Sequence, residues 1–186
     1  MSFLSLSLFN FRNLQNGKID LLSKEVYFVG ENGQGKTNIL EALYYSAYGS
    51  SFRTHTDAQV SKNGETKFSV NCLYNNEKES TQQISVIFDN NKKTIEKNGK
   101  KIRDRKELVN TIPCVLFCHG DMQFAVGAPE NRRFFLDQSL TMYDTLYIDD
   151  LRNYRKILKT RNLVLKESDY QMLVVYDVQL AKYGLE

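Results

Sequence analysis

The sequence of 186 residues is poor in several features that mark particular classes of protein. It has only 2 prolines and 10 glycines, which argues against long flexible linkers, and no apolar run is long enough for a membrane-spanning helix. Its three cysteines are an odd number, and its first residues alternate leucine with serine instead of forming the apolar core of a signal peptide. These absences predict a soluble, cytoplasmic protein without a disulfide framework and without a membrane partner.

Basic residues are concentrated in two blocks, although the formal net charge is only +3. Residues 92–106 hold eight lysines and arginines against two acidic residues, and residues 151–166 hold six with no acidic residue. Such clustering favours a polyanionic partner, but the solvated face of a helix gives the same count. Both interpretations stay open on charge alone.

Apolar patterning predicts strands in the first two thirds of the chain. Residues 3–11 alternate apolar and polar side chains, as a half-buried strand does, whereas 25–29 is a continuous apolar run typical of a buried strand. Polar turns, among them Asn98-Gly99, divide three later segments into an antiparallel meander. The predicted strands are 3–11, 18–22, 25–29, 66–74, 82–89, 93–102 and 112–118.

Helical periodicity follows the third predicted strand and returns near the end of the chain. Pro129 stands where the start of a helix tolerates proline. Further on, Leu151, Leu158 and Leu165 are seven residues apart and form the narrow apolar seam that one helix offers to another. The last helix is expected to fold back on the one before it. The predicted helices are 37–48, 133–140, 145–167 and 169–183.

The segment between the predicted strand 25–29 and the predicted helix 37–48 matches the pattern G-x-x-x-x-G-K-S/T. Its glycines let successive backbone N–H groups point at phosphate oxygens, and the positive end of the following helix adds to the attraction. Lys36 is then expected to reach the β- and γ-phosphates, and the Thr37 hydroxyl to ligate Mg²⁺. The pattern predicts a nucleoside triphosphate site formed by Gly30, Glu31, Asn32, Gly33, Gln34, Gly35, Lys36 and Thr37.

Other blocks occur together with this loop in an order that points to one family. Asn10-Phe11-Arg12-Asn13 comes before the loop, and Asn38-Ile39-Leu40-Glu41-Ala42 comes directly after it. In these residues, and in three later blocks, the chain resembles the RecF family of bacterial recombinational repair proteins, within the ATP-binding-cassette heads that include the SMC proteins. The later blocks are Ser51-Phe52-Arg53-Thr54 with Asp57, Gly127-x-Pro129-x-x-Arg132-Arg133-x-x-Leu136-Asp137, and Tyr154-x-x-x-Leu158-Lys159-x-Arg161-Asn162.

The resemblance implies an α/β P-loop NTPase head of ATP-binding-cassette type with an antiparallel β subdomain. Its first lobe is expected to span 1–143, and 144–186 is expected to be the start of a helical second lobe. We therefore expect the N-terminal portion of a longer protein. By the same resemblance Asn38 and Arg12 join the site, with Arg12 near the base or the phosphates. The alternative for Arg12 is a surface arginine at the end of a strand.

The resemblance also implies ATP-dependent DNA binding in recombinational repair and replication, with ATP and Mg²⁺ as cofactors. The expected partners are single-stranded and gapped DNA, RecO and RecR, and a second copy in an ATP-dependent homodimer. The expected role is recombinase loading, with a contribution to the SOS response. Clustered basic side chains suit phosphate contacts. The candidates for contact with DNA are Lys92, Lys93, Lys100, Lys101, Arg103, Arg105, Arg152, Arg155 and Lys159.

Two parts of such heads are not found in the sequence, a signature motif and a convincing Walker B acid. The runs at 84–89 and 173–177 imitate a Walker B core, but the first falls in the predicted meander and the second in a predicted helix. Neither is interpreted as a Walker B segment. The residues at 118–121 also depart from the family pattern, which leaves Gln123 an open candidate for a Mg²⁺-ligating glutamine. Whether the chain hydrolyses ATP stays open.

Two other functions remain open. The P-loop could be structural in a DNA-binding or scaffold module, which predicts DNA affinity that ignores ATP. Another small P-loop NTPase, such as a nucleotide kinase, needs an arginine-rich lid, whereas the basic block at 92–106 lies in strand-like sequence. Cys114, Cys118 and His119 lack a second pair of zinc ligands, so the cysteines are predicted to be buried apolar side chains.

Overall fold

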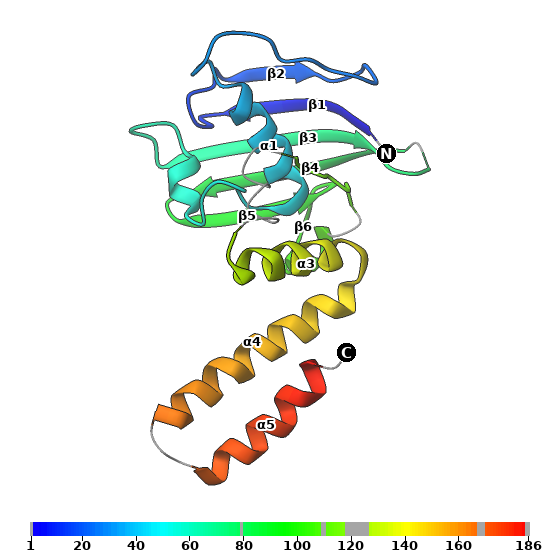
Figure 1. The fold of residues 1–186 in the computed structure, drawn as a ribbon. Helices are drawn as coiled ribbons and strands as arrows, with labels where there is room; N and C mark the ends of the chain where they lie inside the picture. The colour runs from blue at the N-terminus through cyan, green and yellow to red at the C-terminus, as the bar shows by residue number, and fades with distance from the viewer. Residues whose placement is uncertain (1, 79, 109–110, 118–126, 167–169, 185–186) are drawn as a thin grey trace. The chain divides into compact units, whose positions relative to one another are not determined.

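The computed structural model of the chain divides it into two compact units, Met1–Phe117 and Cys118–Glu186, which are described separately (Figure 1). None of the helices in the described part of the chain is both long and apolar enough to cross a membrane. The described residues are 2–78, 80–108, 111–117, 127–166 and 170–184.

The first unit is built on an antiparallel sheet whose described strands follow the order β2-β1-β3-β4-β5-β6. Consecutive strands are mostly neighbours, so short turns join them. The exception is the long connection from β2 to β3, which carries helix α1 (Lys36–Tyr48) and the short helix η1 (Asp57–Val60). The strands are β1 (Ser2–Phe9), β2 (Gly17–Asp20), β3 (Lys67–Asn75), β4 (Thr81–Asp89), β5 (Lys92–Lys97) and β6 (Lys100–Lys101).

The predicted meander is confirmed together with its turns. Asn90 and Asn91 between β4 and β5, and Asn98 and Gly99 between β5 and β6, all have positive φ, as the two central residues of a type I′ hairpin turn require. The Asn98 side chain strengthens its turn, because its Oδ1 accepts a hydrogen bond from the backbone N–H of Gln83 (2.8 Å). The strands predicted at 3–11 and 18–22 are confirmed as β1 and β2.

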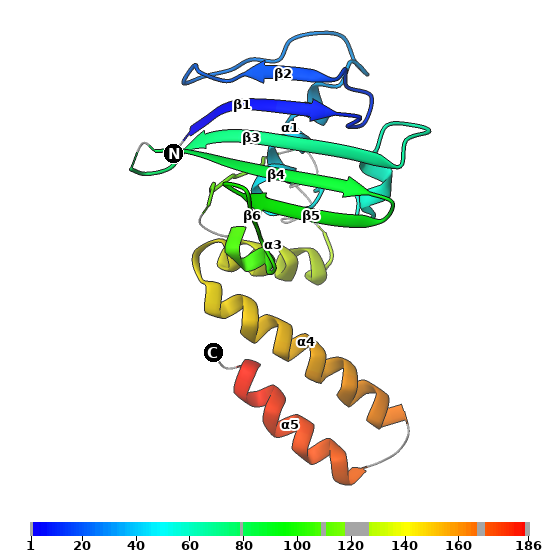
Figure 2. The same cartoon turned by 180° about the vertical axis from the view of Figure 1, so that it is seen from behind.

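The core lies between α1 and one face of the sheet (Figure 1), and Figure 2 shows the opposite face of the sheet in front of α1. Tyr45 of α1 and Phe11 meet the ring of Phe68 edge to face, with centroids 5.5 Å and 5.7 Å away. Burying each such side chain stabilises the fold by about 1.5–3 kcal/mol. The alternating buried residues of β3 and β4 are Phe68, Val70, Cys72, Tyr74, Ile84, Val86 and Phe88.

A largely buried ion pair joins β5 to the start of η1, and the same lysine bonds the end of α1. The Lys93 ammonium donates to Asp57 Oδ2 (2.6 Å) and to the carbonyl of Gly49 (2.9 Å). The other carboxylate oxygen of Asp57 accepts the hydroxyl of Tyr45 (2.6 Å). Because the Lys93 side chain is only 15% exposed, this lysine is engaged inside the fold and does not belong with the predicted DNA contacts.

The strand predicted at 25–29 is not formed. Tyr27 and Val29 are 79% and 93% exposed, and the backbone around them has no strand partner in the described part of the chain. A strand is stable only when a neighbour satisfies its N–H and C=O groups. The described strand nearest in sequence, β2, pairs with β1 alone. The apolar run therefore has the local propensity for a strand, but it forms none because no described strand pairs with it.

The strand predicted at 112–118 is likewise absent from its described part, 112–117; Cys118 lies outside the described residues. Val115 and Phe117 are 83% and 87% exposed. A side chain replaces the missing ladder, since the Tyr48 hydroxyl donates to the Cys114 carbonyl (2.6 Å) and accepts the Cys114 N–H (3.2 Å). These two hydrogen bonds to Tyr48 hold the segment at the end of α1.

Both described cysteines are free thiols; Cys72 is buried in β3, as predicted, whereas Cys114 is half-buried and lies outside the strands. Burial raises the pKa of Cys72, which lies in the core, to about 12. Burial also raises the pKa of the half-buried Cys114. Both thiols therefore stay protonated and unreactive at neutral pH. Cys118, His119 and Gln123 lie outside the described residues.

The described residues of the second unit form helices α3 (Pro129–Tyr143), α4 (Thr145–Lys166) and α5 (Tyr170–Gly184), which confirms the three predicted helices. Asp137 of α3 is bonded to α4, because its carboxylate accepts Tyr147 Oη (2.8 Å) and Arg155 Nη2 (2.8 Å). These bonds join α3 to α4 within the second unit, while the predicted lobe boundary at residue 143 stays a prediction.

Helices α4 and α5 form an antiparallel hairpin (Figures 1 and 2). Leu151 and Leu158 of the predicted seam are half-buried, whereas Leu165, near the end of α4, is 46% exposed. An ion pair between Arg161 Nε and Asp177 Oδ1 (2.6 Å) connects the two helices. The run at 173–177, which imitates a Walker B core, lies in α5 as predicted, and the run at 84–89 lies in β4.

Gly49 is a test of how tightly α1 packs on the sheet. It ends α1 in the left-handed region (φ 63°), and a Cβ there would lie 2.6 Å from Ile95 Cδ1 and 3.3 Å from Leu108 Cδ1. We expect Gly49→Ala to lower the free energy of unfolding, measured by urea denaturation, by about 3 kcal/mol, because left-handed strain and overpacking add.

Gly64 provides the matched control, since it also has positive φ (84°) but has open space around its Cα. Gly64→Ala is expected to cost only the backbone strain, about 1 kcal/mol. Equal losses in the two variants would contradict the tight packing of α1 against Ile95 and Leu108.

Candidate functional site

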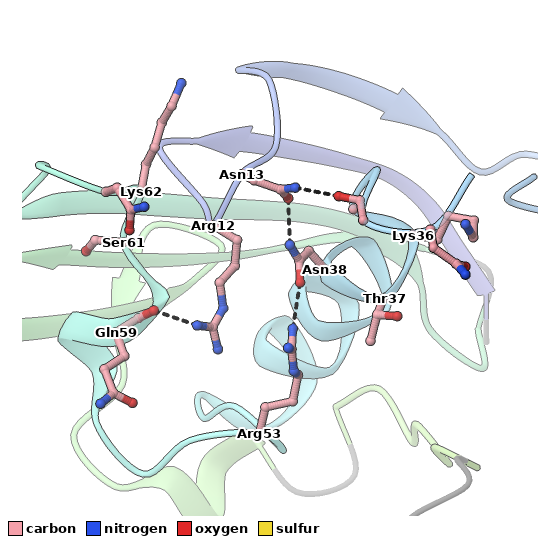
Figure 3. Close-up of a pocket in the computed structure, with 13 residues that line it drawn as sticks. Arg12, Asn13, Lys36, Thr37, Asn38, Arg53, Gln59, Ser61 and Lys62 are labelled. Atoms are coloured by element: carbon pink, nitrogen blue, oxygen red, sulfur yellow. Dashed lines mark hydrogen bonds between the residues drawn. The ribbon is translucent and has the colours of Figure 1, made fainter. Parts of the chain in front are cut away.

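A cleft of about 620 Å³ lies over the N-terminal end of α1. Four loops of the first unit border it: the loop after β1, the loop that precedes α1, the loop between α1 and η1, which carries Arg53, and the loop after η1 (Figure 3). It is lined by Arg12, Asn13, Asn32, Gly33, Gly35, Lys36, Thr37, Asn38, Arg53, Gln59, Ser61, Lys62 and Asn63. Four of these are basic and none is acidic, so the described lining attracts anions.

The loop before α1 has the backbone that the glycine-rich pattern predicts. Gly35 caps the helix in the left-handed region (φ 96°), and its carbonyl accepts the N–H groups of Asn38 (2.9 Å) and Ile39 (3.1 Å). A Cβ on Gly35 would lie 2.6 Å from Leu14 Cδ2, so the position accepts glycine alone without a shift of Leu14. Gly35 and the first residues of α1 line the cleft, so the N-terminal end of the helix borders it, as in an anion-binding helix N-terminus.

Lys36 closes this loop on itself. Its Nζ donates hydrogen bonds to the carbonyls of Gly30 and Glu31, both at 2.7 Å. The Gln34 side chain supports the same turn, because its Oε1 accepts the N–H of Glu31 (3.2 Å). The Lys36 ammonium is thus held where the loop begins. Thr37 is the next residue, and its exposed side chain lines the cleft.

Two asparagines join the loop after β1 to the P-loop and to α1 (Figure 3). Asn13 Nδ2 donates to the Gly33 carbonyl (2.9 Å), and Asn38 Nδ2 donates to Asn13 Oδ1 (2.6 Å). Arg53 continues the chain of bonds, since its Nη1 donates to Asn38 Oδ1 (2.7 Å). This series of hydrogen bonds sets the spacing between the loops that border the cleft.

Glu41 is fully buried below the cleft, one turn along α1 from Thr37. Its two carboxylate oxygens accept Arg12 Nε (3.0 Å) and Arg12 Nη2 (2.5 Å), which is a two-pronged arginine–carboxylate pair. The same carboxylate accepts Ser51 Oγ (2.5 Å) and Arg53 Nη1 (3.4 Å). A buried charge is tolerated only when it is paired and hydrogen-bonded, and these four bonds satisfy that condition.

Arg12 is locked by its surroundings. Its Nη1 donates to the Gln59 carbonyl (2.6 Å), its backbone N–H donates to the Val60 carbonyl (2.8 Å), and its side chain is 19% exposed. The residue has positive φ (52°), a conformation that costs a non-glycine residue energy and persists only where contacts enforce it. Of the two alternatives for Arg12, the structure supports a place in the cleft.

The predicted P-loop residues divide into two groups. Arg12, Asn38 and five residues of the loop line the cleft, whereas Gly30, Glu31 and Gln34 shape the loop through the bonds described above. The pattern did not point to the end of the cleft formed by η1 and the loop after it, where the residues are Gln59, Ser61, Lys62 and Asn63. No motif marks these polar residues. Contacts between segments distant in the sequence bring them beside Arg12: the pairing of Phe11 with Ser61 and the hydrogen bonds from Arg12 to the carbonyls of Gln59 and Val60.

The candidate DNA contacts are distributed over both units. In the first unit Lys92, Lys100, Lys101 and Arg103 are exposed, and of Arg105 only the backbone in η2 (Arg105–Leu108) is described. In the second unit, exposed basic residues of α4 pair with acidic neighbours: Arg155 with Asp137, and Arg152 with Asp149, three residues earlier on the same helix. Lys159 forms no ion pair with the residues that the structure describes.

Comparison with known proteins agrees with this geometry. The AAA domain family matches residues 5–171. The DNA replication and repair protein RecF of Treponema pallidum (strain Nichols) is 49% identical over 179 residues, which are 95% of this chain and 50% of the relative. RecF of Clostridium botulinum (strain Loch Maree / Type A3) is 39% identical over 184 residues, 97% of this chain and 50% of the relative.

Solved structures show the same likeness. The structure described as the recombination mediator protein RecF-ATP in the RecFOR pathway superposes with a TM-score of 0.91 at 30% identity, covering 98% of this chain and 51% of that chain. The chain thus spans about half the length of the relatives that it matches. The predicted α/β P-loop head of ATP-binding-cassette type and the predicted resemblance are both confirmed. The chain belongs to the AAA domain family and is similar, over nearly all of its length, to RecF proteins.

Proposed function

We propose that this chain binds Mg-ATP in the cleft over α1 and that the ATP-bound form binds DNA in recombinational repair. The observation that carries the proposal is the ordered P-loop, with the Lys36 ammonium at its start and the first turn of α1 open to the cleft. The likeness to a structure described as RecF-ATP supports it.

The cleft fits a nucleoside triphosphate in size and in charge. Its volume of about 620 Å³ is in the usual range for small-molecule sites. The triphosphate belongs at the P-loop end, where backbone N–H groups and Lys36 bind phosphate oxygens. The nucleoside then extends toward the end that holds Arg12, Ser61 and Lys62. The buried Ser61 hydroxyl has no hydrogen-bond partner among the described residues and suits a polar nucleoside group.

Mg²⁺ fits the P-loop end of the cleft, beside the proposed position of the phosphates. Magnesium prefers oxygen ligands and usually keeps several waters, and substrate phosphates provide much of its coordination. The Thr37 hydroxyl is an exposed oxygen at this end and is the residue that would hold the ion. The bound ion would neutralise phosphate charge, while Lys36 and the helix N-terminus orient the phosphates.

The exposed lysines and arginine around the β5–β6 hairpin are proposed as a DNA contact. Lys100 and Lys101 form β6, and the exposed Lys92 and Arg103 lie on the same part of the chain. Phosphate contacts need clustered cations but no fixed geometry, and this hairpin provides such a cluster. By similarity to a protein of the RecFOR pathway, we propose gapped or single-stranded DNA, RecO, RecR and a second copy of the protein as partners.

Lys36→Ala tests the nucleotide site directly. We expect isothermal titration to show saturable Mg-ATP binding by the chain and at least about tenfold weaker binding by the variant, because a charge-assisted bond to phosphate is lost. Lys67→Ala is the control, since Lys67 is exposed and pairs with Asp89 on the sheet, away from the cleft. Equal affinities for the chain and for Lys36→Ala, with both folded by circular dichroism, would refute the phosphate cradle.

The hairpin is tested by the double substitution Lys100→Ala/Lys101→Ala. We expect weaker binding of single-stranded DNA in fluorescence anisotropy. The slope of log K against log salt concentration should become shallower by the contribution of one or two phosphate contacts, because each contact on a single strand contributes about −0.7 to that slope.

The double substitution Lys18→Ala/Lys67→Ala removes the same charge elsewhere on the sheet and is the matched control. If it weakens binding as much, the net charge and not the hairpin carries the affinity. The titrations are repeated with Mg-ATP, because an affinity that ignores ATP favours the alternative of a DNA-binding module with a structural P-loop.

A further inference from the structure

We propose that Glu41 is a positioning residue of the nucleotide site, acting through Arg12 and Arg53. This inference rests on the proposed function and deepens it. Glu41 does not line the cleft, yet its carboxylate holds two of the four basic side chains that do. The position of these cations relative to Lys36 is therefore set from below the cleft.

The helix itself explains how one residue does this. Glu41 follows Thr37 by four positions and Asn38 by three, spacings that place side chains on the same face of a helix. The buried carboxylate of Glu41 thus lies on the same face of α1 as Thr37 and Asn38, which line the cleft. Any ligand contact at the start of α1 and the positions of the two arginines are defined by the same rigid element.

The two arginines are held to different degrees. Arg12 donates three hydrogen bonds, two of them to Glu41, and its side chain is 19% exposed. Arg53 is 47% exposed and meets Glu41 at 3.4 Å, while its shorter bond, at 2.7 Å, goes to Asn38. Arg12 is therefore a fixed part of the wall. Arg53 keeps guanidinium donors that bond none of the described residues, and it is retained at the edge of the cleft by Glu41 and Asn38 together.

Ser51 completes the arrangement around Arg53. Its hydroxyl donates to Glu41 Oε1 (2.5 Å) and accepts the backbone N–H groups of Arg53 (2.9 Å) and Thr54 (3.1 Å). Glu41 thereby fixes the backbone that carries Arg53 as well as the guanidinium. Loss of the carboxylate would release both.

Glu41→Gln separates positioning from simple charge by the sign of its effect. An amide of the same shape accepts at one oxygen only, and its NH₂ group would face the N–H donors of Arg12, so the two-pronged pair is lost. Removal of a negative charge below a triphosphate site should tighten ATP binding if Coulomb attraction alone mattered. Positioning predicts the opposite result.

The experiment is isothermal titration of Mg-ATP into the 186-residue chain and its variants, each checked for folding by circular dichroism. We expect Glu41→Gln to bind about tenfold more weakly than the unsubstituted chain. Glu65→Gln removes one negative charge near Lys62 without touching the network, and is expected to bind as tightly as the unsubstituted chain or more tightly. In an Arg53→Ala background, the effect of Glu41→Gln should shrink, because one of its two targets is absent.

The outcomes are distinct. An unsubstituted chain that does not bind Mg-ATP refutes the proposed function, whereas a binding chain with an equally tight or tighter Glu41→Gln variant refutes the positioning role alone. An undiminished effect of Glu41→Gln in the Arg53→Ala background also overturns the part assigned to Arg53. If Glu41→Gln does not fold, Ser51→Ala tests the proposal instead. It keeps the charges of Glu41 and Arg53, and it removes the hydroxyl that links Glu41 to the Arg53 backbone. Unchanged affinity in Ser51→Ala then overturns the proposal.

Discussion

The buried carboxylate of Glu41 is the interaction on which the cleft depends. It bonds the loop after β1 through Arg12 and the loop after α1 through Ser51 and Arg53, and it belongs to the helix that begins at the P-loop. Removing a carboxylate from water is costly, and only several charge-assisted bonds with good geometry offset that cost. The loops around the cleft must therefore keep the positions that satisfy Glu41, which gives the site its fixed shape.

The antiparallel sheet supports this arrangement from the other side. The residues after β1 leave the sheet in a left-handed conformation, and they stay there because Asn10 accepts the Lys62 N–H (2.8 Å) and the Arg12 N–H bonds Val60 (2.8 Å). Below them Phe11, Tyr45 and Phe68 pack edge to face in the core. The stable part of the unit thus holds strained backbone at the cleft, where a ligand would use it.

Local sequence patterns were sufficient to predict a strand where its pairing partner is the next strand along the chain. The meander from β3 to β6 was predictable because its turns, such as Asn98-Gly99, bring adjacent segments together and alternation shows which face is buried. The runs at 25–29 and 112–117 have the same local preference for strand, but no described strand lies beside them. Tyr27, Val29, Val115 and Phe117 are largely exposed, although Ile112 is buried in the core. A strand is a property of at least two segments, so propensity alone overstated these two.

The sequence by itself determined the P-loop, the helix that follows it, the helices of the second unit and the likeness to RecF, because each depends on residues close together in the chain or on blocks in a fixed order. Only the tertiary structure decided that Arg12 belongs to the cleft wall, that Gln59, Ser61, Lys62 and Asn63 complete it, and that Lys93 is engaged with Asp57 inside the fold. Glu41 lies 29 positions from its partner Arg12, and Lys93 lies 36 from Asp57. No local pattern encodes such pairs, since a charged side chain looks the same in sequence whether it faces water or a buried partner.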